Sequence, residues 1–234
     1  SMAIKAVNRL DDWMNRTYLR IKQHGNLEAN NLSSLIAQYL YCRSFFLKDR
    51  AIAPQHREAV EYFINQAVKK EKDGTQYFLR LSRMNQAQVA IAMNRIGEFQ
   101  KKVEYDRLSR LIVASIKERS VTDEELGLFW RDLEYSHWWY RAPIETQAMM
   151  IEAFHEVTQD FDAMEDAKVW LLKQKQTQDW KTTKATADAC YALLLQGANL
   201  LASEALVEVT VGDQKIEPKK VEAGTGFYEH RFLG

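Results

Sequence analysis

Apolar side chains recur at helical spacing along most of the chain, up to about residue 196. Leu32, Ile36, Tyr39 and Leu40 share one face of such a pattern, because residues three, four and seven apart lie on the same side of an α-helix. The periodicity therefore predicts a series of amphipathic helices. They are expected over residues 4–23, from 32 onwards, from 54 to before 74, and over 85–96, 102–118, 143–157, 161–175 and 182–196.

A few residues mark the expected helix boundaries. Pro54 and Pro143 favour helix starts, since the fixed φ of proline suits the first helical position. Thr182 is expected to cap the last helix through its hydroxyl. Gly97 follows an alanine-rich stretch and is predicted to end that helix as a C-terminal cap.

Two segments break the helical pattern. Residues 128–140 crowd aromatic rings together, which is typical of a hairpin or irregular segment packed by those rings. After Gly197 the period changes to alternation, and short strands are predicted over 205–211, 215–217 and 226–233. We therefore expect a helical region over residues 3–197 and a β segment over 203–234 that begins a following domain.

Small residues recur on every second predicted helix, about 40 to 60 residues apart. Small side chains let helices approach closely, so these helices are expected to form an inner layer. The predicted fold is all-α, an incomplete α/α toroid of helix pairs with a small C-terminal β segment; an open solenoid is the alternative. The repeated pairs are Ala37/Cys42, Ala87/Ala92, Ala148/Ala153 and Ala187/Ala192.

Charge and composition narrow the possible functions. The 32 basic residues balance the 32 acidic residues, so the chain has no net field that would gather nucleic acid, and no nucleic-acid partner is expected. No apolar run approaches the ~20 residues of a membrane span, so no direct membrane insertion is expected. Cys42 and Cys190 sit in apolar helical patterns and are predicted to be buried.

Three stretches in the second half resemble a known family. HWWYRAPIETQAMMIEAF (137–154) is similar to its E-T/S-x-A-x-x-L-x-A helix, AKVWLLKQKQ (167–176) to its W-L-x-x-Q/K-Q, and DWKTTKATADACYAL (179–193) to its G-x-W-x-S/T-T-x-x-T-x-x-A-x-x-A-L. Their order and spacing also agree. The chain thus resembles, over about residues 130–196, the C-terminal part of the thioester domain of bacterial alpha-2-macroglobulins, a complement-component-like domain.

The resemblance implies a broad-spectrum endopeptidase inhibitor that traps proteases, and not an enzyme. Its implied partners are neighbouring macroglobulin domains of the same parent chain and target proteases, and its implied location is the periplasm or cell envelope. The family's thioester needs Cys and Gln three residues apart. Cys42 precedes Arg43-Ser44-Phe45 and Cys190 precedes Tyr191-Ala192-Leu193, so the thioester motif lies upstream or the parent protein lacks it.

The aromatic segment supplies the candidate site. It is predicted to be a ligand or docking cluster, although Glu145 also fits the first turn of a helix, where an acid is stabilised by the helix dipole. The alternative is a glycan-active α/α-barrel enzyme that uses Asp132 and Glu145 beside tryptophans that stack on sugar rings. The predicted cluster is Trp130, Trp138, Trp139, Tyr140 and Glu145.

No cofactor or metal site is predicted. Glu152 and His155 share a helix face, but a metal site in a helical bundle needs a second such pair, and the sequence has none. The two main hypotheses make different predictions about the centre of the toroid. A docking domain is expected to lack an acid pair there, whereas the enzyme is expected to have a cleft lined by Asp132, Glu145 and tryptophans.

Overall fold

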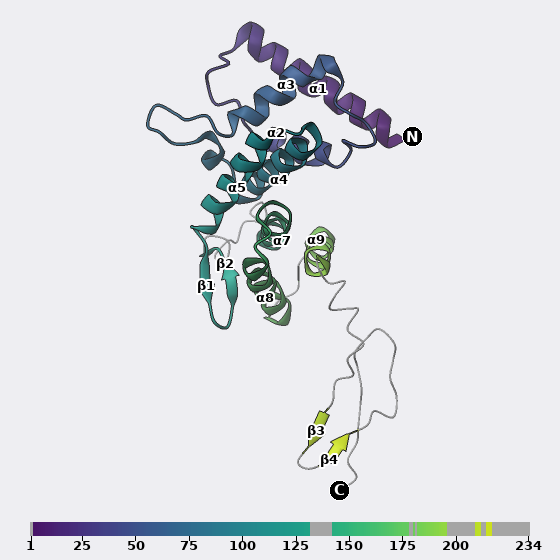
Figure 1. Ribbon diagram of the computed structural model, residues 1–234, viewed down its shortest axis with the longest axis vertical. Helices are drawn as coiled ribbons and strands as arrows, with labels where there is room; N and C mark the ends of the chain where they lie inside the picture. The colour runs from purple at the N-terminus through teal and green to yellow at the C-terminus, as the bar shows by residue number, and fades with distance from the viewer. Residues whose placement is uncertain are drawn as a thin grey trace. The chain divides into compact units, whose positions relative to one another are not determined.

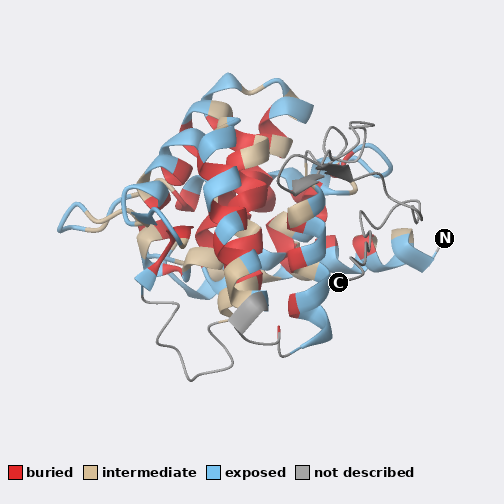
Figure 2. Cartoon of the chain, turned by 90° about the horizontal axis from the view of Figure 1, so that it is seen from below, coloured by how far each residue is buried: buried red, intermediate tan, exposed pale blue. Residues whose placement is uncertain are grey.

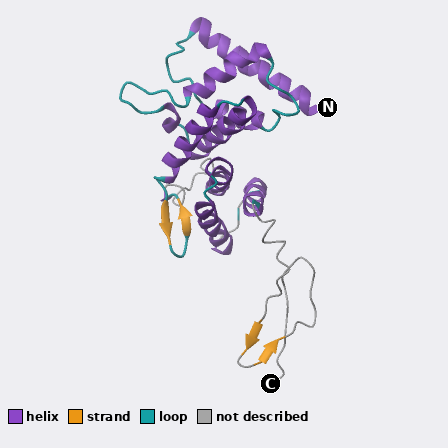
Figure 3. Ribbon diagram, viewed as in Figure 1, coloured by secondary structure: helices purple, strands orange, loops and turns teal. Residues whose placement is uncertain are grey.

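Helices dominate the computed structural model (Figure 1, Figure 3). The structure describes residues 2–131, 142–177, 180, 182–195, 209–211 and 214–216. These ranges contain eight α-helices and two short antiparallel hairpins, so the all-α class with a small β segment is confirmed. The helices are α1 (Met2–His24), α2 (Ser34–Ser44), α3 (Pro54–Gln66), α4 (Arg83–Gln100), α5 (Val103–Lys117), α7 (Pro143–Ala153), α8 (Phe161–Thr177) and α9 (Thr183–Leu194), with a 3₁₀ turn η1 (Tyr77–Arg80) and a π-helical turn η3 (Phe154–Thr158).

The predicted helix starts agree with the structure. Pro54 and Pro143 occupy the first turns of α3 and α7. The Oγ1 atom of Thr182 accepts a hydrogen bond from the backbone N–H of Ala185 at 3.0 Å, so Thr182 caps α9. This bond satisfies a backbone donor that would otherwise have no partner at the helix end.

The predicted end of the fourth helix at Gly97 is wrong. The helix α4 continues to Gln100, and Lys101 forms the cap in the left-handed conformation, at φ 57°. Gly97 is small for a different reason: a Cβ atom there would lie 2.8 Å from the Cβ of Tyr105 on α5. The glycine therefore permits close packing of α4 against α5 and does not terminate a helix.

The helices that carry the small-residue repeat lie next to one another. In the row α2, α4, α7, α9 each helix packs against the next, while α5 packs on α4 and α8 packs on α7. Ala37, Ala87, Ala148 and Ala192 are buried in this row. Ala187 is exposed, so α9 fits the repeat only at its second position. The repeat thus predicts which helices are neighbours, because small side chains let them approach.

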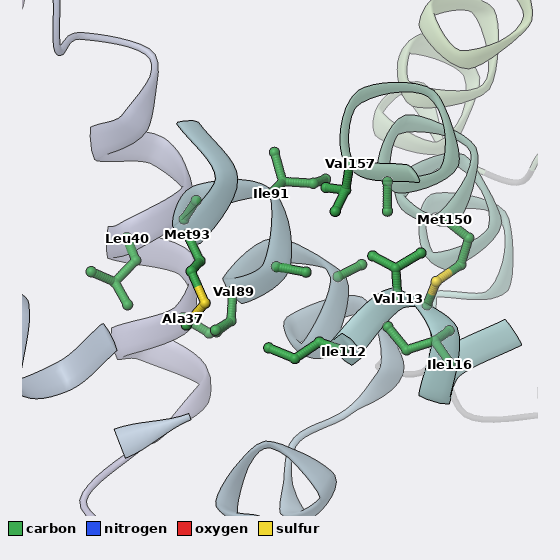
Figure 4. Packing of buried hydrophobic residues seen from close by; sticks show 14 of the residues in the cluster. Ala37, Leu40, Val89, Ile91, Met93, Ile112, Val113, Ile116, Met150 and Val157 are labelled. Atoms are coloured by element: carbon green, nitrogen blue, oxygen red, sulfur yellow. The ribbon is translucent and has the colours of Figure 1, made fainter. Parts of the chain in front are cut away.

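The core follows this row of helices. Twelve of the eighteen residues of α4 are buried. Figure 2 shows buried residues on the sides of the helices that face other helices. Figure 4 shows how Met93 of α4 lies toward Ala37 and Leu40 of α2, and Ile91 toward Val157. No helix of the described part is both long and apolar enough to cross a membrane.

A β-hairpin follows α5 at residues 121–129, earlier than the hairpin or irregular segment predicted over 128–140, most of which lies outside the described residues. Strand β1 (Val121–Asp123) pairs antiparallel with β2 (Gly127–Phe129), and β2 packs against α8. Gly127 has φ 74°, and a Cβ atom there would lie 2.1 Å from the carbonyl oxygen of Asp166. Only glycine fits this position, so the hairpin and α8 can touch through their backbones.

The chain divides into two units, Ser1–Leu195 and Gln196–Gly234. In the second unit, β3 (Val209–Val211) pairs antiparallel with β4 (Gln214–Ile216). These strands lie within or next to the predicted strands 205–211 and 215–217. The strand predicted over 226–233 lies outside the described residues.

The expected burial of the two cysteines is wrong. Cys42 of α2 and Cys190 of α9 are both exposed free thiols. Partial burial of the Cys42 thiol nevertheless raises its pKa. The apolar neighbours of each cysteine in the sequence are therefore a poor guide to its burial, which depends on how closely other helices pack around it.

Candidate functional site

The predicted aromatic cluster divides between the core and the part of the chain that the structure does not describe. Trp130 is fully buried, its ring stacks on Phe154 at 6.4 Å, and its Nε1–H donates to the carbonyl oxygen of Ile116 at 3.1 Å. Trp130 is therefore a core residue that fills space behind the hairpin, and it cannot stack on a ligand. Asp132, Trp138, Trp139 and Tyr140 lie outside the described residues.

Glu145 lies in a different place, at the wall of a cavity. It is the third residue of α7 and its side chain is 9% exposed. Its Oε1 atom accepts a long hydrogen bond of 3.5 Å from the Oγ1 atom of Thr182. Among the described residues it has no cationic partner. The positive end of the α7 dipole stabilises this carboxylate in part.

The cavity lies between the four helices of the inner row and has a volume of about 250 Å³. Every one of these helices contributes side chains to its wall, so the cavity exists only because α2, α4, α7 and α9 are neighbours. Its wall contains aromatic and thioether side chains as well as carboxylates and amides. The lining residues are Gln38, Tyr41, Cys42, Met84, Gln88, Glu145, Ala148, Met149, Glu152, Lys184, Asp188 and Tyr191.

Glu152, two turns along α7, belongs to a buried charge network. Arg95 of α4 donates to the Oε1 atom of Glu152 at 2.7 Å and forms a bidentate ion pair with Glu156 in η3. Tyr41 donates its hydroxyl to Glu152 at 2.7 Å. The Arg95 guanidinium also lies 4.1 Å from the ring centroid of Phe45. The network connects α2, α4 and α7 behind the cavity.

Burial controls the protonation of this network. Desolvation raises the pKa of Glu152, although the hydrogen bond from Tyr41 and the charge of Arg95 act in the opposite direction. Desolvation and the negative charge of Glu152 raise the pKa of Tyr41 above its usual range, so Tyr41 remains a hydrogen-bond donor. Ionised Glu152 accepts from both Arg95 and Tyr41, which leaves it little capacity to bind anything else.

The third carboxylate of the cavity, Asp188, forms an ion pair with Lys184 one turn away on α9. The cavity therefore holds three carboxylates, of which only Glu145 lacks a cation among the described residues.

The acid pair of the glycan-active alternative is described only at Glu145, because Asp132 lies outside the described residues. The other acid of the cavity on α7, Glu152, is seven residues from Glu145, a rise of about 10.5 Å along the helix axis. Glu152 is also fixed by Arg95 and Tyr41. Of the residues expected to line a glycan cleft, only Glu145 lines this cavity in the described part of the chain.

Glu152 and His155, the pair considered for metal binding, have separate surroundings. Glu152 binds Arg95, and the ring of His155 lies 6.4 Å from that of Phe161. Within the described ranges, no three His, Cys, Asp or Glu side chains group as metal ligands would.

Most of the cavity residues were not predicted from the sequence. Tyr41, Glu152, Asp188 and Tyr191 come from three helices that are distant in the chain. A signal does exist, because each of these residues lies on a helix of the small-residue repeat. Which face of each helix turns toward the cavity is decided by packing.

The three helices with the family-like stretches pack against one another: α7 against α8 and α9, and α8 against α9. Comparison with protein-family models, with curated proteins and with solved structures finds no match for this chain.

Proposed function

We propose that this chain is a non-catalytic docking domain of a macroglobulin-type endopeptidase inhibitor in the bacterial periplasm or cell envelope. The observation that carries the proposal is the consecutive packing of α2, α4, α7 and α9, the helices of the small-residue repeat. The family-like stretches occupy three adjacent helices of this arrangement. A helical toroid of this family is expected to have such an inner row.

The absence of a catalytic role fits the chemistry of the interior. Two of the three cavity carboxylates are held in ion pairs, by Arg95 and Lys184. A general acid or base must be free to exchange a proton with a substrate. Of the paired groups, Arg95 and Glu152 connect α4 to α7, whereas Lys184 and Asp188 pair within α9.

Docking on neighbouring modules of the parent chain would use apolar side chains at the surface. Leu172 of α8 and Leu194 of α9 are 49% and 61% exposed. Both lie on helices with the family-like stretches. We expect these helices to contact the modules that surround a trapped protease.

The test uses the full-length gene product. It is incubated at equimolar ratio with serine, cysteine and metallo-endopeptidases, and cleavage of a large protein substrate is compared with cleavage of a small chromogenic peptide. A trap shields the protease sterically, so we expect cleavage of the protein to fall and cleavage of the peptide to continue. Unchanged cleavage of both substrates, or equal loss of both, would rule out the proposed function.

Surface variants of the full-length product test the docking helices. Leu172→Asp with Leu194→Asp is expected to reduce trapping without changing the helical circular dichroism. Val103→Asp is the matched control, because Val103 is 80% exposed on α5. Equal loss of trapping in both variants would show that α8 and α9 have no special role.

A further inference from the structure

We propose that the cavity between α2, α4, α7 and α9 binds a cationic group on an aliphatic stem, an ammonium or guanidinium, with Glu145 as its counter-ion. This inference does not depend on the proposed function. It rests on the cavity and on two of the buried side chains in its wall, each of which has one polar atom without a hydrogen-bond partner in the described part of the chain.

The first of these side chains is Glu145. A buried carboxylate loses its hydration, and a stable protein normally compensates this with a cation or several hydrogen bonds. Glu145 is 9% exposed and accepts one hydrogen bond, the 3.5 Å contact from Thr182. Its other oxygen accepts none from the described residues. The dipole of α7 compensates only part of the charge.

The second is Gln88 of α4, which is 6% exposed. Its Oε1 atom accepts from the Nδ2 atom of Asn85 at 2.8 Å, which assigns the amide nitrogen to the other side. That nitrogen has no acceptor among the described residues. The Gln88 amide nitrogen can therefore donate to a carbonyl oxygen of the ligand. The backbone of a basic residue in a peptide has such a carbonyl close to the cationic side chain.

The charges around the cavity favour a cation. Among the described residues, Glu145, Glu152 and Asp188 line the cavity together with one cation, Lys184. Arg95, behind the cavity, is bonded to both Glu152 and Glu156. Both cations are already held by carboxylates other than Glu145. A positive ligand restores the balance, whereas an anion would add to the excess.

The apolar walls favour an aliphatic stem. Met84 and Met149 line the cavity together with the rings of Tyr41 and Tyr191. Thioethers adapt to the shape of a flexible chain, and aromatic faces attract cations. The volume of about 250 Å³ is far larger than a single water needs. Lysine and arginine side chains, and free diamines, share this combination of stem and charge.

Calorimetry on the full 234-residue chain at low ionic strength tests the proposal. The probes are N-acetyl-arginine amide, its neutral isostere N-acetyl-citrulline amide, and the free amine agmatine. We expect arginine amide to bind at least about tenfold more tightly than citrulline amide, since hydrogen bonds to charged groups are the stronger class. Equal binding of the two isosteres, or no binding of either cation, overturns the proposal.

The two cationic probes distinguish the source of the group. Binding of arginine amide with weaker binding of agmatine assigns the site to a basic peptide side chain. The reverse order supports the same cation chemistry and assigns it to a small amine.

Variants locate the binding. Glu145→Gln is expected to weaken arginine amide at least about tenfold. Asp188→Asn is also expected to weaken it, because Lys184 is then free to pair with Glu145. Glu118→Gln is the control, since Glu118 is exposed and lies outside the cavity lining. An effect of Glu118→Gln as large as that of Glu145→Gln overturns the proposal.

Methyl NMR tests the location without any variant. With ¹³C-methyl methionine, titration of arginine amide is expected to shift the signals of Met84 and Met149. Met14 is fully buried outside the cavity lining and is expected to remain unchanged. Shifts that omit both Met84 and Met149 overturn the proposal even if a cation binds.

Discussion

At the scale of single residues, buried charge is the strongest constraint on this protein. Arg95 is a side chain of α4 that compensates two carboxylates, and the ion pair to Glu152 is almost fully buried on the acidic side. A buried ion pair adds little net stability over an apolar pair, but removal of one partner leaves a charge without compensation.

Replacement of Arg95 by methionine is therefore expected to destabilise the protein by about 3 to 5 kcal/mol in urea unfolding at pH 7. The control Arg110→Met removes an exposed pair with Asp106 and is expected to cost about 0.5 kcal/mol or less. Similar losses in the two variants would show that the network is solvated.

The same network predicts a pH effect. Because burial raises the pKa of Glu152, the folded state binds a proton more readily than the unfolded state does. The ionised group therefore destabilises the fold at neutral pH, and this effect disappears as pH falls through the raised pKa toward the unfolded value of about 4.3. Urea unfolding of Arg95→Met is expected to show partial recovery of stability on mild acidification. Glu152→Gln in the same background is expected to abolish that recovery; if recovery persists, another group is responsible.

Replacement of Gly97 by alanine tests whether close packing or helix propensity dominates at this position, because the two effects change the stability in opposite directions. Alanine within a helix is favoured over glycine by about 1 kcal/mol, but the new Cβ at Gly97 would meet Tyr105 at 2.8 Å. Gly97→Ala is therefore expected to destabilise by about 1 to 3 kcal/mol. Ala114→Gly, at an exposed position of α5, calibrates the propensity effect. A gain in stability from Gly97→Ala would contradict the close approach of α4 and α5.

At the scale of elements, single polar residues connect helix ends. Asp160 precedes α8, accepts a hydrogen bond from the N–H of Ala163 at 3.2 Å, and pairs with Lys117 at the end of α5. Partial burial raises the pKa of Asp160, but these two contacts outweigh it and lower the pKa below its usual value. The Asp160 carboxylate thus caps α8 and forms an ion pair with α5.

Asp160→Asn is expected to keep the cap, since asparagine caps helices as well as aspartate does, and to lose the ion pair. The lowered pKa means that the ionised form stabilises the fold above the unfolded pKa of about 3.9, and that this stability is lost as pH falls through the lower folded value. Unfolding at pH 7 is thus expected to show a loss of up to about 1 kcal/mol, which vanishes near pH 2. Asp162→Asn, in the exposed first turn of α8, is the control and is expected to change little. A loss that persists unchanged at pH 2 would exclude the ion pair as the cause.

At the scale of the whole molecule, the first unit contains its own core. Buried residues from α1 to α9 form a single hydrophobic cluster. Proteins of this size usually need one contiguous core to fold independently.

A chain that ends at Leu195 is therefore expected to fold alone, with one cooperative thermal transition by circular dichroism at the temperature of the full chain. The carbonyl oxygen of Leu195 accepts from Lys168, so this end point retains that contact. A shorter chain that ends before Thr183 removes α9 and is expected to melt earlier. Loss of the helical signal in the chain that ends at Leu195 would contradict independent folding of the first unit.

Local sequence pattern was sufficient to predict the α-helices, but not the position of the hairpin at residues 121–129. Apolar periodicity predicted the helices, prolines and Thr182 predicted starts, and the repeat of small residues predicted that α2, α4, α7 and α9 are neighbours. The predictions were wrong at Gly97, which is small because α5 packs closely against it, and at Cys42, whose exposure depends on how the other helices pack around α2. The candidate site was predicted at Glu145, but its surroundings were not.

The sequence by itself determined which segments form helices, because helical periodicity and capping act over a few residues. The tertiary structure alone decided which side chains share the cavity. Tyr41, Glu152 and Asp188 come together from helices that are up to about 150 residues apart in the chain. Apolar periodicity marks the face that a helix buries, but it does not say which other helix covers that face, and packing decides this.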